Sequence, residues 1–192
     1  LGAYVLREAC AEAQSWSETG HDDIRVTVNV SSRQLLDPGF ETTVAAALDE
    51  SGLDPSRLIL EVTESSFMHQ PEVAIPKLDR VSETGVRMAL DDFGEGYSSL
   101  GHLRDLPIDI LKIARPFIHE LTAGSNDPAL VRGIIELARS LGLKLIAEGI
   151  ESPEQQAILR AFACQLGQGF LFSPPVESKQ LRTMLVEQHV PL

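Results

Sequence analysis

Polar and charged side chains recur where short apolar runs of this sequence end: Asn29, Glu61, Asp91, Asp92, Lys112, Glu148, Glu151 and Gln168. Carboxylates and an amide oxygen are the hard ligands that Mg²⁺ and Mn²⁺ prefer. Carboxylates gathered at one place would repel one another unless a cation lay between them. A lysine beside oxygen-bound metal suits the hydrolysis of a phosphate ester, and the same parts suit enolisation by a magnesium enzyme. The residue types alone leave both chemistries open.

Each of these residues also has an ordinary structural explanation. Asp91 and Asp92 could cap a solvated turn, and Lys112 could extend along the surface. Glu148 could be an acidic residue at a helix N-terminus, where the helix dipole stabilises negative charge. Glu61 is harder to explain in this way, because it lies inside an apolar run and glutamate is seldom buried without a partner. Chemistry is favoured only if the fold brings these side chains to one place.

The apolar runs alternate with amphipathic segments, which predicts strands separated by helices. The runs cover residues 24–31, 58–63, 86–91, 108–113, 143–148 and a weaker segment that ends near residue 170. Helices are predicted over residues 1–16, 38–52, 71–85, 128–142, from 153 onward, and over 179–187. This alternation is typical of an α/β fold with a parallel sheet.

Two α/β architectures compete. A doubly wound sheet would favour a glycine-rich loop after its first strand, and the sequence has none there. A (β/α)8 barrel carries its chemistry at the carboxyl ends of many strands, which is where the candidate residues lie. We therefore expect a barrel with about six βα units, in a single domain over residues 1–192. Its mouth would bring together the carboxylates of Glu61, Asp91, Asp92, Glu148 and Glu151.

The 192 residues carry 16 Lys and Arg against 28 Asp and Glu, a formal charge of −12. This balance argues against a nucleic-acid polymer as partner, because phosphate contacts need clustered cations. No run is long and apolar enough to cross a membrane, and no secretory signal is present, so we expect a cytoplasmic protein. The sequence has no cluster of Cys or His, which disfavours zinc. Since it begins at Leu1 inside a predicted helix, we expect a piece of a longer protein.

Six motifs occur in order along the chain: Val28-Asn29-Val30-Ser31, Leu60-Glu61-Val62-Thr63-Glu64-Ser65, Asp91-Asp92-Phe93-Gly94 followed by Gly96-Tyr97-Ser98-Ser99-Leu100, Leu106-Pro107 leading to Leu111-Lys112-Ile113, Ala147-Glu148-Gly149-Ile150-Glu151, and Gln168-Gly169-Phe170. Together they resemble the EAL-domain family, the bacterial cyclic di-GMP phosphodiesterases. The resemblance covers essentially the whole chain. It implies a modified TIM (β/α)8 barrel that is incomplete at the N-terminus.

The same resemblance implies metal-dependent hydrolysis of cyclic di-GMP to linear pGpG. The cofactor would be Mg²⁺ or Mn²⁺, as two ions, and the matching ligand positions are Asn29, Glu61, Asp91, Asp92 and Glu148. The predicted catalytic set is Lys112, Glu148, Asp92, Glu151, Gln168 and Glu64.

Within that set the resemblance implies distinct roles. Lys112 matches the residue that binds the attacking water, and Glu148 matches a general base. Glu151 and Gln168 match supporting residues of the active site. Glu64 matches a residue that steadies the loop from Phe93 to Leu100, which in the family couples dimerisation to catalysis.

Several positions depart from the family pattern. The naming tripeptide Glu-Ala-Leu, whose Glu is a metal ligand, does not occur and would lie upstream of Leu1. Ala114 stands where Asp is usual, and Glu95 stands where a small residue or Thr is usual. Phe170 replaces the commoner Tyr, and Gln165 replaces a frequent acid.

Two interpretations therefore stay open. The parent protein is an active phosphodiesterase, or it is a catalytically inactive receptor for cyclic di-GMP or a protein-interaction domain. The ordered motifs disfavour an enolisation barrel. We expect a homodimer, with sensory or cyclase domains in the parent chain. The isolated chain is expected to be inactive, and either to be of low stability or to dimerise across its open strand edges.

Overall fold

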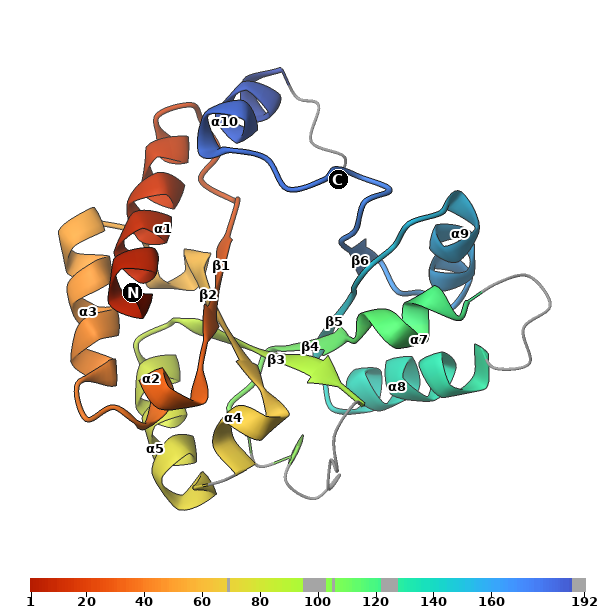
Figure 1. Ribbon diagram of the computed structural model, residues 1–192, viewed down its shortest axis with the longest axis horizontal. Coiled ribbons are helices and arrows are strands. Elements are labelled where there is room, and N and C mark those ends of the chain that lie inside the picture. The colour runs from red at the N-terminus through yellow and green to blue at the C-terminus, as the bar shows by residue number, and fades with distance from the viewer. Residues whose placement is uncertain (69, 95–102, 105, 122–127, 188–192) are drawn as a thin grey trace. The chain divides into compact units, whose positions relative to one another are not determined.

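The computed structural model describes residues 1–68, 70–94, 103–104, 106–121 and 128–187 (Figure 1). They form two compact units, Leu1–Met88 with Pro175–Leu192, and Ala89–Pro174. The prediction of a single domain over the whole chain stays a prediction. None of the described helices is long and apolar enough to cross a membrane.

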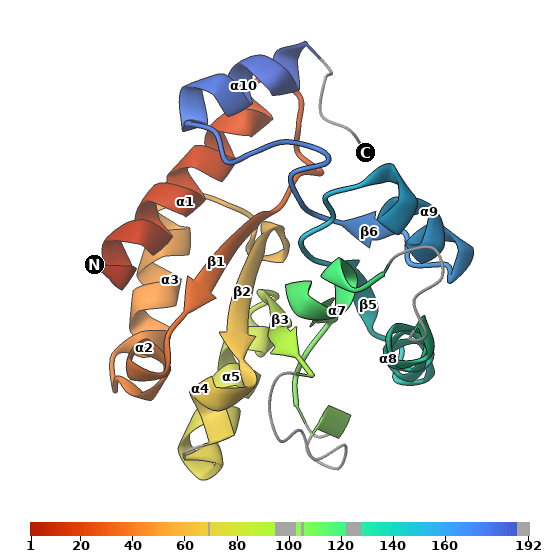
Figure 2. The same ribbon diagram turned by 45° about the vertical axis from the view of Figure 1, so that its right-hand side comes forward.

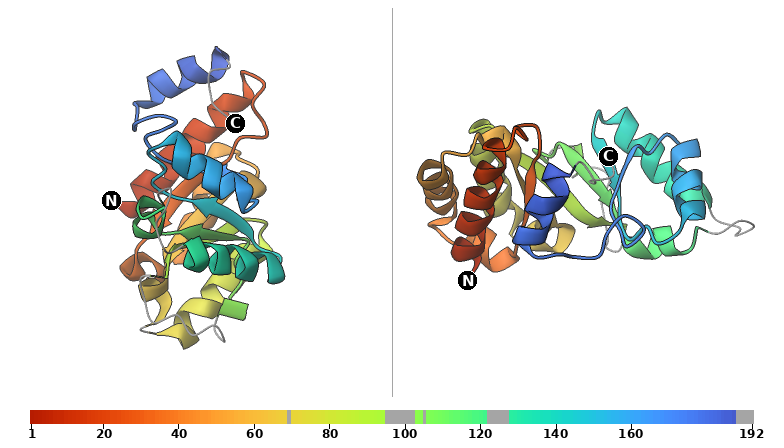
Figure 3. Two further views of the ribbon diagram at one scale, coloured as in Figure 1. Left: turned by 90° about the vertical axis from the view of Figure 1, so that its right-hand side faces the viewer. Right: turned by 90° about the horizontal axis from the view of Figure 1, so that it is seen from above.

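The first unit holds two parallel strands and the helices packed on them. Its elements in chain order are α1 (Gly2–Ser17), β1 (Val26–Val30), α2 (Ser32–Leu36), α3 (Phe40–Ser51), the 3-10 helix η1 (Pro55–Arg57), β2 (Leu58–Thr63), α4 (Glu64–Met68), α5 (Pro71–Glu83) and α10 (Ser178–Val186). β1 and β2 pair in parallel, from Val26 opposite Leu58 to Val30 opposite Val62. Helices α1 and α3 lie side by side (Figure 1 and Figure 3).

Two arginines tie the first unit together. Arg57 is almost fully buried, and its guanidinium donates to the carbonyl oxygens of Ala13 at 2.8 Å and Ile24 at 3.0 Å. Arg182 donates from Nε to Glu12 Oε1 at 2.7 Å and also bonds the second carboxylate oxygen through Nη2. This pair holds α10 beside α1, as Figure 2 shows.

The second unit contains the remaining strands. Its elements are β3 (Arg87–Phe93), which begins at the end of the first unit, β4 (Ile110–Ile113), α7 (Arg115–His119), α8 (Pro128–Ser140), β5 (Lys144–Ala147), α9 (Pro153–Ala161) and β6 (Leu166–Gly167). The strands β3, β4, β5 and β6 pair in parallel in chain order. Parallel order places their carboxyl ends at one edge. Asp91 and Asp92 lie in the last part of β3 and Lys112 in β4, whereas Glu148, Glu151 and Gln168 follow β5 and β6.

The predicted alternation of strands and helices is confirmed, with strands one to three residues shorter than the apolar runs at some ends. The helix predicted from residue 38 begins at Phe40, after a separate α2 that sequence reasoning missed. A capping box marks α2, since Ser31 Oγ accepts from Gln34 N and Gln34 Oε1 accepts from Ser31 N. The short helices α4 and α7 were also missed, because five residues are too few to show a helical period.

Candidate functional site

A β-bulge in β3 brings two adjacent aspartates together. Leu90 pairs with Leu111 and Phe93 pairs with Ile113, so β3 has one extra residue between these pairs. In a regular strand, adjacent side chains point to opposite faces. Here Asp92 has a φ of 54° and its N–H donates to Asp91 Oδ1 at 3.0 Å. The bulge therefore allows both carboxylates to serve one site.

Lys112 lies on β4 between two carboxylates. Its side chain is only 3% exposed, and Nζ is 3.1 Å from Asp91 Oδ1 and in contact with Glu148 Oε1. A buried ammonium is costly without such partners. Lys112 is thus a buried, paired group and not a lysine that extends along the surface.

Glu148 follows β5 and has a second partner from the loop after β6. Gln168 Nε2 donates to Glu148 Oε1 at 2.7 Å. The two loops are joined through the backbone, since Ile150 N donates to Gln168 O at 3.0 Å. A Cβ on Gly169 would lie 2.1 Å from Ile150 O, so only glycine permits this approach. The glycine therefore lets Gln168 reach Glu148.

Three carboxylates of the second unit form a cluster that could hold a cation. One oxygen each of Asp91, Asp92 and Glu148 lies within 4.8 Å of the others. Burial raises the pKa of the Asp92 carboxyl, the negative charge of Asp91 raises it further, and the ammonium of Lys112 opposes both. Closely spaced hard oxygens suit a divalent metal ion. The donor set therefore fits a cation of the predicted type.

Glu151 is not a member of this cluster. Its Oε1 lies 2.6 Å from Nη2 of Arg115, the first residue of α7. An exposed arginine thus balances a carboxylate that we expected to join the others. The supporting role predicted for Glu151 stays a prediction.

The first unit holds the other three candidates. Asn29 on β1 lies opposite Glu61 on β2 in the parallel register, so both side chains project from the same face of the pair. Glu61 is 7% exposed, whereas Asn29 is exposed. Asn29 also lines a pocket of about 760 Å³ between α1, β1, α2 and α3. Glu64 is the first residue of α4.

Two departures from the family pattern lie in the second unit. Ala114 is fully buried and is the N-cap of α7, where it offers no side-chain oxygen to the helix. Phe170 is 64% exposed. Most of the predicted loop from Phe93 to Leu100, including Glu95, lies outside the described residues.

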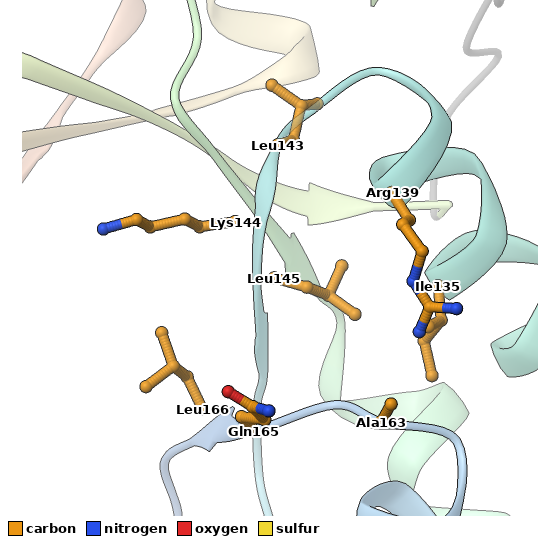
Figure 4. A pocket seen from close by; sticks show the side chains of 8 residues that line it. All are labelled: Ile135, Arg139, Leu143, Lys144, Leu145, Ala163, Gln165 and Leu166. Atoms are coloured by element: carbon orange, nitrogen blue, oxygen red, sulfur yellow. The ribbon is translucent and has the colours of Figure 1, made fainter.

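A pocket of the second unit lies apart from the candidate residues. It has a volume of about 370 Å³ and is lined by α8, β5 and the segment before β6. Figure 4 shows Leu145 directed toward Ile135, whereas Lys144 points to the other side of the strand. Gln165 lines this pocket. None of the predicted catalytic or metal-binding residues does.

Sequence reasoning missed two residues that hold the site. Arg115 pairs with Glu151, and Gln155 bonds the backbone of Glu151, Ser152 and Ile118. The Ser-Pro-Glu-Gln sequence at residues 152–155 signalled a helix start, and this is confirmed by the capping box of α9. The third bond, to Ile118, has no local signal because the partner is 37 residues away.

Comparison with known proteins gives one family. The sequence profile described as the EAL domain matches residues 1–175. Over 181 residues the chain is 44% identical to MucR of Pseudomonas aeruginosa, a bifunctional diguanylate cyclase/cyclic di-GMP phosphodiesterase. This match covers 94% of the chain and 26% of MucR, so the chain spans about a quarter of that relative's length.

Solved structures show the same fold. A MucR phosphodiesterase in complex with cyclic di-GMP matches with a TM-score of 0.89 at 44% identity, over 94% of this chain and 73% of the other. The EAL domain of Mycobacterium smegmatis DcpA matches with a TM-score of 0.93 at 41% identity, over 100% of this chain and 86% of the other. Klebsiella pneumoniae BlrP1, in complex with calcium and cyclic di-GMP, matches with a TM-score of 0.82 at 26% identity, over 92% of this chain and 44% of the other.

These likenesses confirm the predicted architecture, a TIM-like α/β barrel that is incomplete in this chain. The chain belongs to the EAL domain family.

Proposed function

We propose that this domain, within its parent protein, hydrolyses one phosphodiester bond of cyclic di-GMP and releases linear pGpG. The observation that carries the proposal is the position of Lys112, buried between Asp91 and Glu148 beside the three-carboxylate cluster. The relative MucR is named as a cyclic di-GMP phosphodiesterase and is 44% identical to this chain.

The metal requirement rests on the donor set. Asp91, Asp92 and Glu148 offer hard oxygens at the spacing that a cation needs. By resemblance to the family, Asn29 and Glu61 are proposed as further ligands, and the site is proposed to bind two Mg²⁺ or Mn²⁺ ions. Bound cations of this kind polarise a phosphate and lower the pKa of a bound water. The calcium complex of BlrP1 supports an oxygen-ligated divalent ion.

Two side chains of this chain would then have separate roles: one would stabilise charge and orient the water, and the other would accept a proton. Lys112 Nζ would hold and orient the attacking water and stabilise negative charge that develops on the phosphate. Glu148 Oε1 would accept the proton of that water as its oxygen bonds to phosphorus. The P–O3′ bond breaks, and the O3′ oxygen takes up a proton from solvent. Gln168 Nε2 holds Glu148 in place for this step.

The remaining predicted residues have supporting roles in this proposal. Glu151 would help to order the turn after Glu148, and Asp92 would complete the cation site. Glu64 would steady the segment that follows β3, by resemblance to the family.

A receptor or protein-interaction domain is the second candidate. The observation that favours it is Ala114, which is buried and has no oxygen where the family usually has Asp. A receptor would bind cyclic di-GMP with the same residues and leave it intact.

The surroundings of the domain are also proposed. The parent chain would carry sensory or cyclase domains and work as a homodimer in the cytoplasm. MucR supports the cyclase part, since its name includes that second activity.

The parent protein, with cyclic di-GMP and Mg²⁺ or Mn²⁺, tests the proposal, and Glu148→Ala is the control. Linear pGpG from the wild type and none from the variant is the expected result. Saturable binding without product would establish the receptor instead. Ala114→Asp is then the first substitution to try, because gain of product would identify the missing oxygen as the cause.

A further inference from the structure

The turn that carries Glu148 is tied to α7 at two points. This turn covers residues 148–152, between β5 and α9. Its first residue is bound to β4, since Glu148 N donates to Ile113 O at 3.2 Å. Its middle is bound to the segment after β6, since Ile150 N donates to Gln168 O and Ile150 O accepts from Leu171 N, each at 3.0 Å. Glu151 and Ser152, which complete the turn, need partners of their own, because a loop has few internal backbone bonds.

Gln155 supplies the first tie. Its side chain is 6% exposed, and Oε1 accepts from Glu151 N at 2.8 Å and Ser152 N at 3.0 Å. Its Nε2 donates to Ile118 O of α7 at 3.1 Å, in a buried position. One amide therefore satisfies three backbone groups from two separate segments, and a buried polar group with all its bonds is rigid.

Arg115 supplies the second tie. Its stem covers Gly149, because a Cβ there would lie 2.3 Å from Arg115 Cγ. Its guanidinium then reaches Glu151 at 2.6 Å. The two ties hold the turn at its middle and at its end.

The tied turn determines where the Glu148 carboxylate lies. Glu148 begins the turn, and its Oε1 contacts Lys112 and accepts from Gln168. Groups that orient such a carboxylate commonly alter metal affinity or rate by about 10–100-fold when changed. Because Glu148 N is held on β4, a shift of the residues that follow would change the direction of the Glu148 side chain while Lys112 stays on its strand.

We propose that Gln155 is a positioning residue, whose amide fixes the turn 148–152 to α7 and so keeps the Glu148 carboxylate against Lys112. The kinetic consequence rests on the proposed hydrolysis of cyclic di-GMP. The effect on the turn and on metal binding does not.

Gln155→Glu separates the tie from the helix cap. The glutamate keeps an acceptor for Glu151 N and Ser152 N, but it loses the donor to Ile118 O. Gln156→Glu is the matched control, because it adds the same charge to the same helix one residue later, at a half-buried position. Gln155→Met keeps the volume and removes all three bonds, so it serves as a second variant with a different folding risk.

Three readouts on the full-length protein test the proposal. Gln155→Glu should lower kcat about tenfold with KM within about twofold, and Gln155→Met should lower it further. Free Mn²⁺ measured by electron paramagnetic resonance should show weaker Mn²⁺ binding in both variants than in Gln156→Glu. Amide hydrogen exchange at Glu151 and Ser152 should be faster in Gln155→Met than in the wild type.

The outcomes separate this proposal from the function. If the wild type makes no pGpG, the proposed reaction fails, while Mn²⁺ binding and exchange still decide the role of Gln155. Thermal melting first shows whether each Gln155 variant is folded. If both are folded and match Gln156→Glu in kcat and Mn²⁺ affinity, Gln155 is structural only. If either variant fails to fold, the folded one carries the same comparison. If neither folds, the positioning role is rejected in favour of a structural one.

Discussion

The Lys112 ammonium lies 3.1 Å from Asp91 Oδ1 on one side and contacts Glu148 Oε1 on the other. The two carboxylates come from different strand ends, and both side chains are 13% exposed. In the proposed site Lys112 would compete with a metal ion for these oxygens, and its positive charge would also hold the attacking water.

Replacing Lys112 with Met should separate these two effects. Removal of the positive charge leaves the carboxylates more attractive to a cation, so Mn²⁺ should bind more tightly. Loss of the group that holds the water should lower kcat by ~100-fold or more. Isothermal titration with Mn²⁺ and a rate assay on the same samples test both. Weaker Mn²⁺ binding would contradict competition between Lys112 and the metal.

Gly169→Ala should disturb the contact between Gln168 and Glu148. The added Cβ would lie 2.1 Å from the backbone oxygen of Ile150, and a strained backbone costs about 1–3 kcal/mol. Gly133→Ala is the control, because it lies in α8 with open space around the added atom. That change should stabilise the chain by about 1 kcal/mol. Urea unfolding of the two variants measures both values, and equal effects would contradict the close approach at Gly169.

The pH dependence of stability should reveal the pair between Glu12 and Arg182. The hydrogen bond from Arg182 lowers the pKa of the Glu12 carboxyl, the Trp16 indole adds to this, and burial opposes it. A lowered carboxyl pKa contributes stability above the pKa of the unfolded chain, and this contribution is lost as pH falls through the folded pKa.

Glu12→Gln should therefore lower the free energy of unfolding near neutral pH and have little effect in strong acid. Glu50→Gln is the control, because the Arg7–Glu50 pair is about half exposed on both sides and should contribute little. Thermal melts over a pH series provide the comparison. A Glu12→Gln effect that grows on acidification would be the opposite of the expected sign.

Ala163→Gly should stabilise the second unit. Ala163 follows α9 with a φ of 62°, and the bonds from Ala163 N to Arg160 O and from Cys164 N to Leu159 O form a Schellman motif. Left-handed geometry is costly for alanine, and the freedom of glycine in the unfolded chain offsets part of the gain. We expect a net gain of about 0.5 kcal/mol in urea unfolding, with no change in metal binding. A loss of stability would show that Ala163 makes packing contacts that outweigh its strain.

Much of the second unit could be predicted from sequence because its chemistry lies at strand ends. The apolar runs located β3, β4 and β5, and the polar residues in the last part of these runs marked the edge where Asp91, Lys112 and Glu148 meet. A parallel strand order was enough to predict that meeting, since it places carboxyl ends together.

Other features depend on geometry that no local pattern carries. Strict alternation would have sent Asp91 and Asp92 to opposite faces, and only the bulge brings them together. Glu151 was expected among the carboxylates because its type and position fit, but Arg115 on α7 pairs with it. The bond from Gln155 to Ile118 joins residues that are distant in sequence, so its capping signal revealed only half of its contacts.

The most direct test of the central claim is a single-turnover reaction of the full-length protein with cyclic di-GMP and Mn²⁺ in ¹⁸O-labelled water. Mass spectrometry should find linear pGpG with one ¹⁸O atom in its 5′-phosphate, and Glu148→Ala should give none. Stoichiometric binding of cyclic di-GMP with the ligand recovered intact and unlabelled would contradict the phosphodiesterase and identify a receptor.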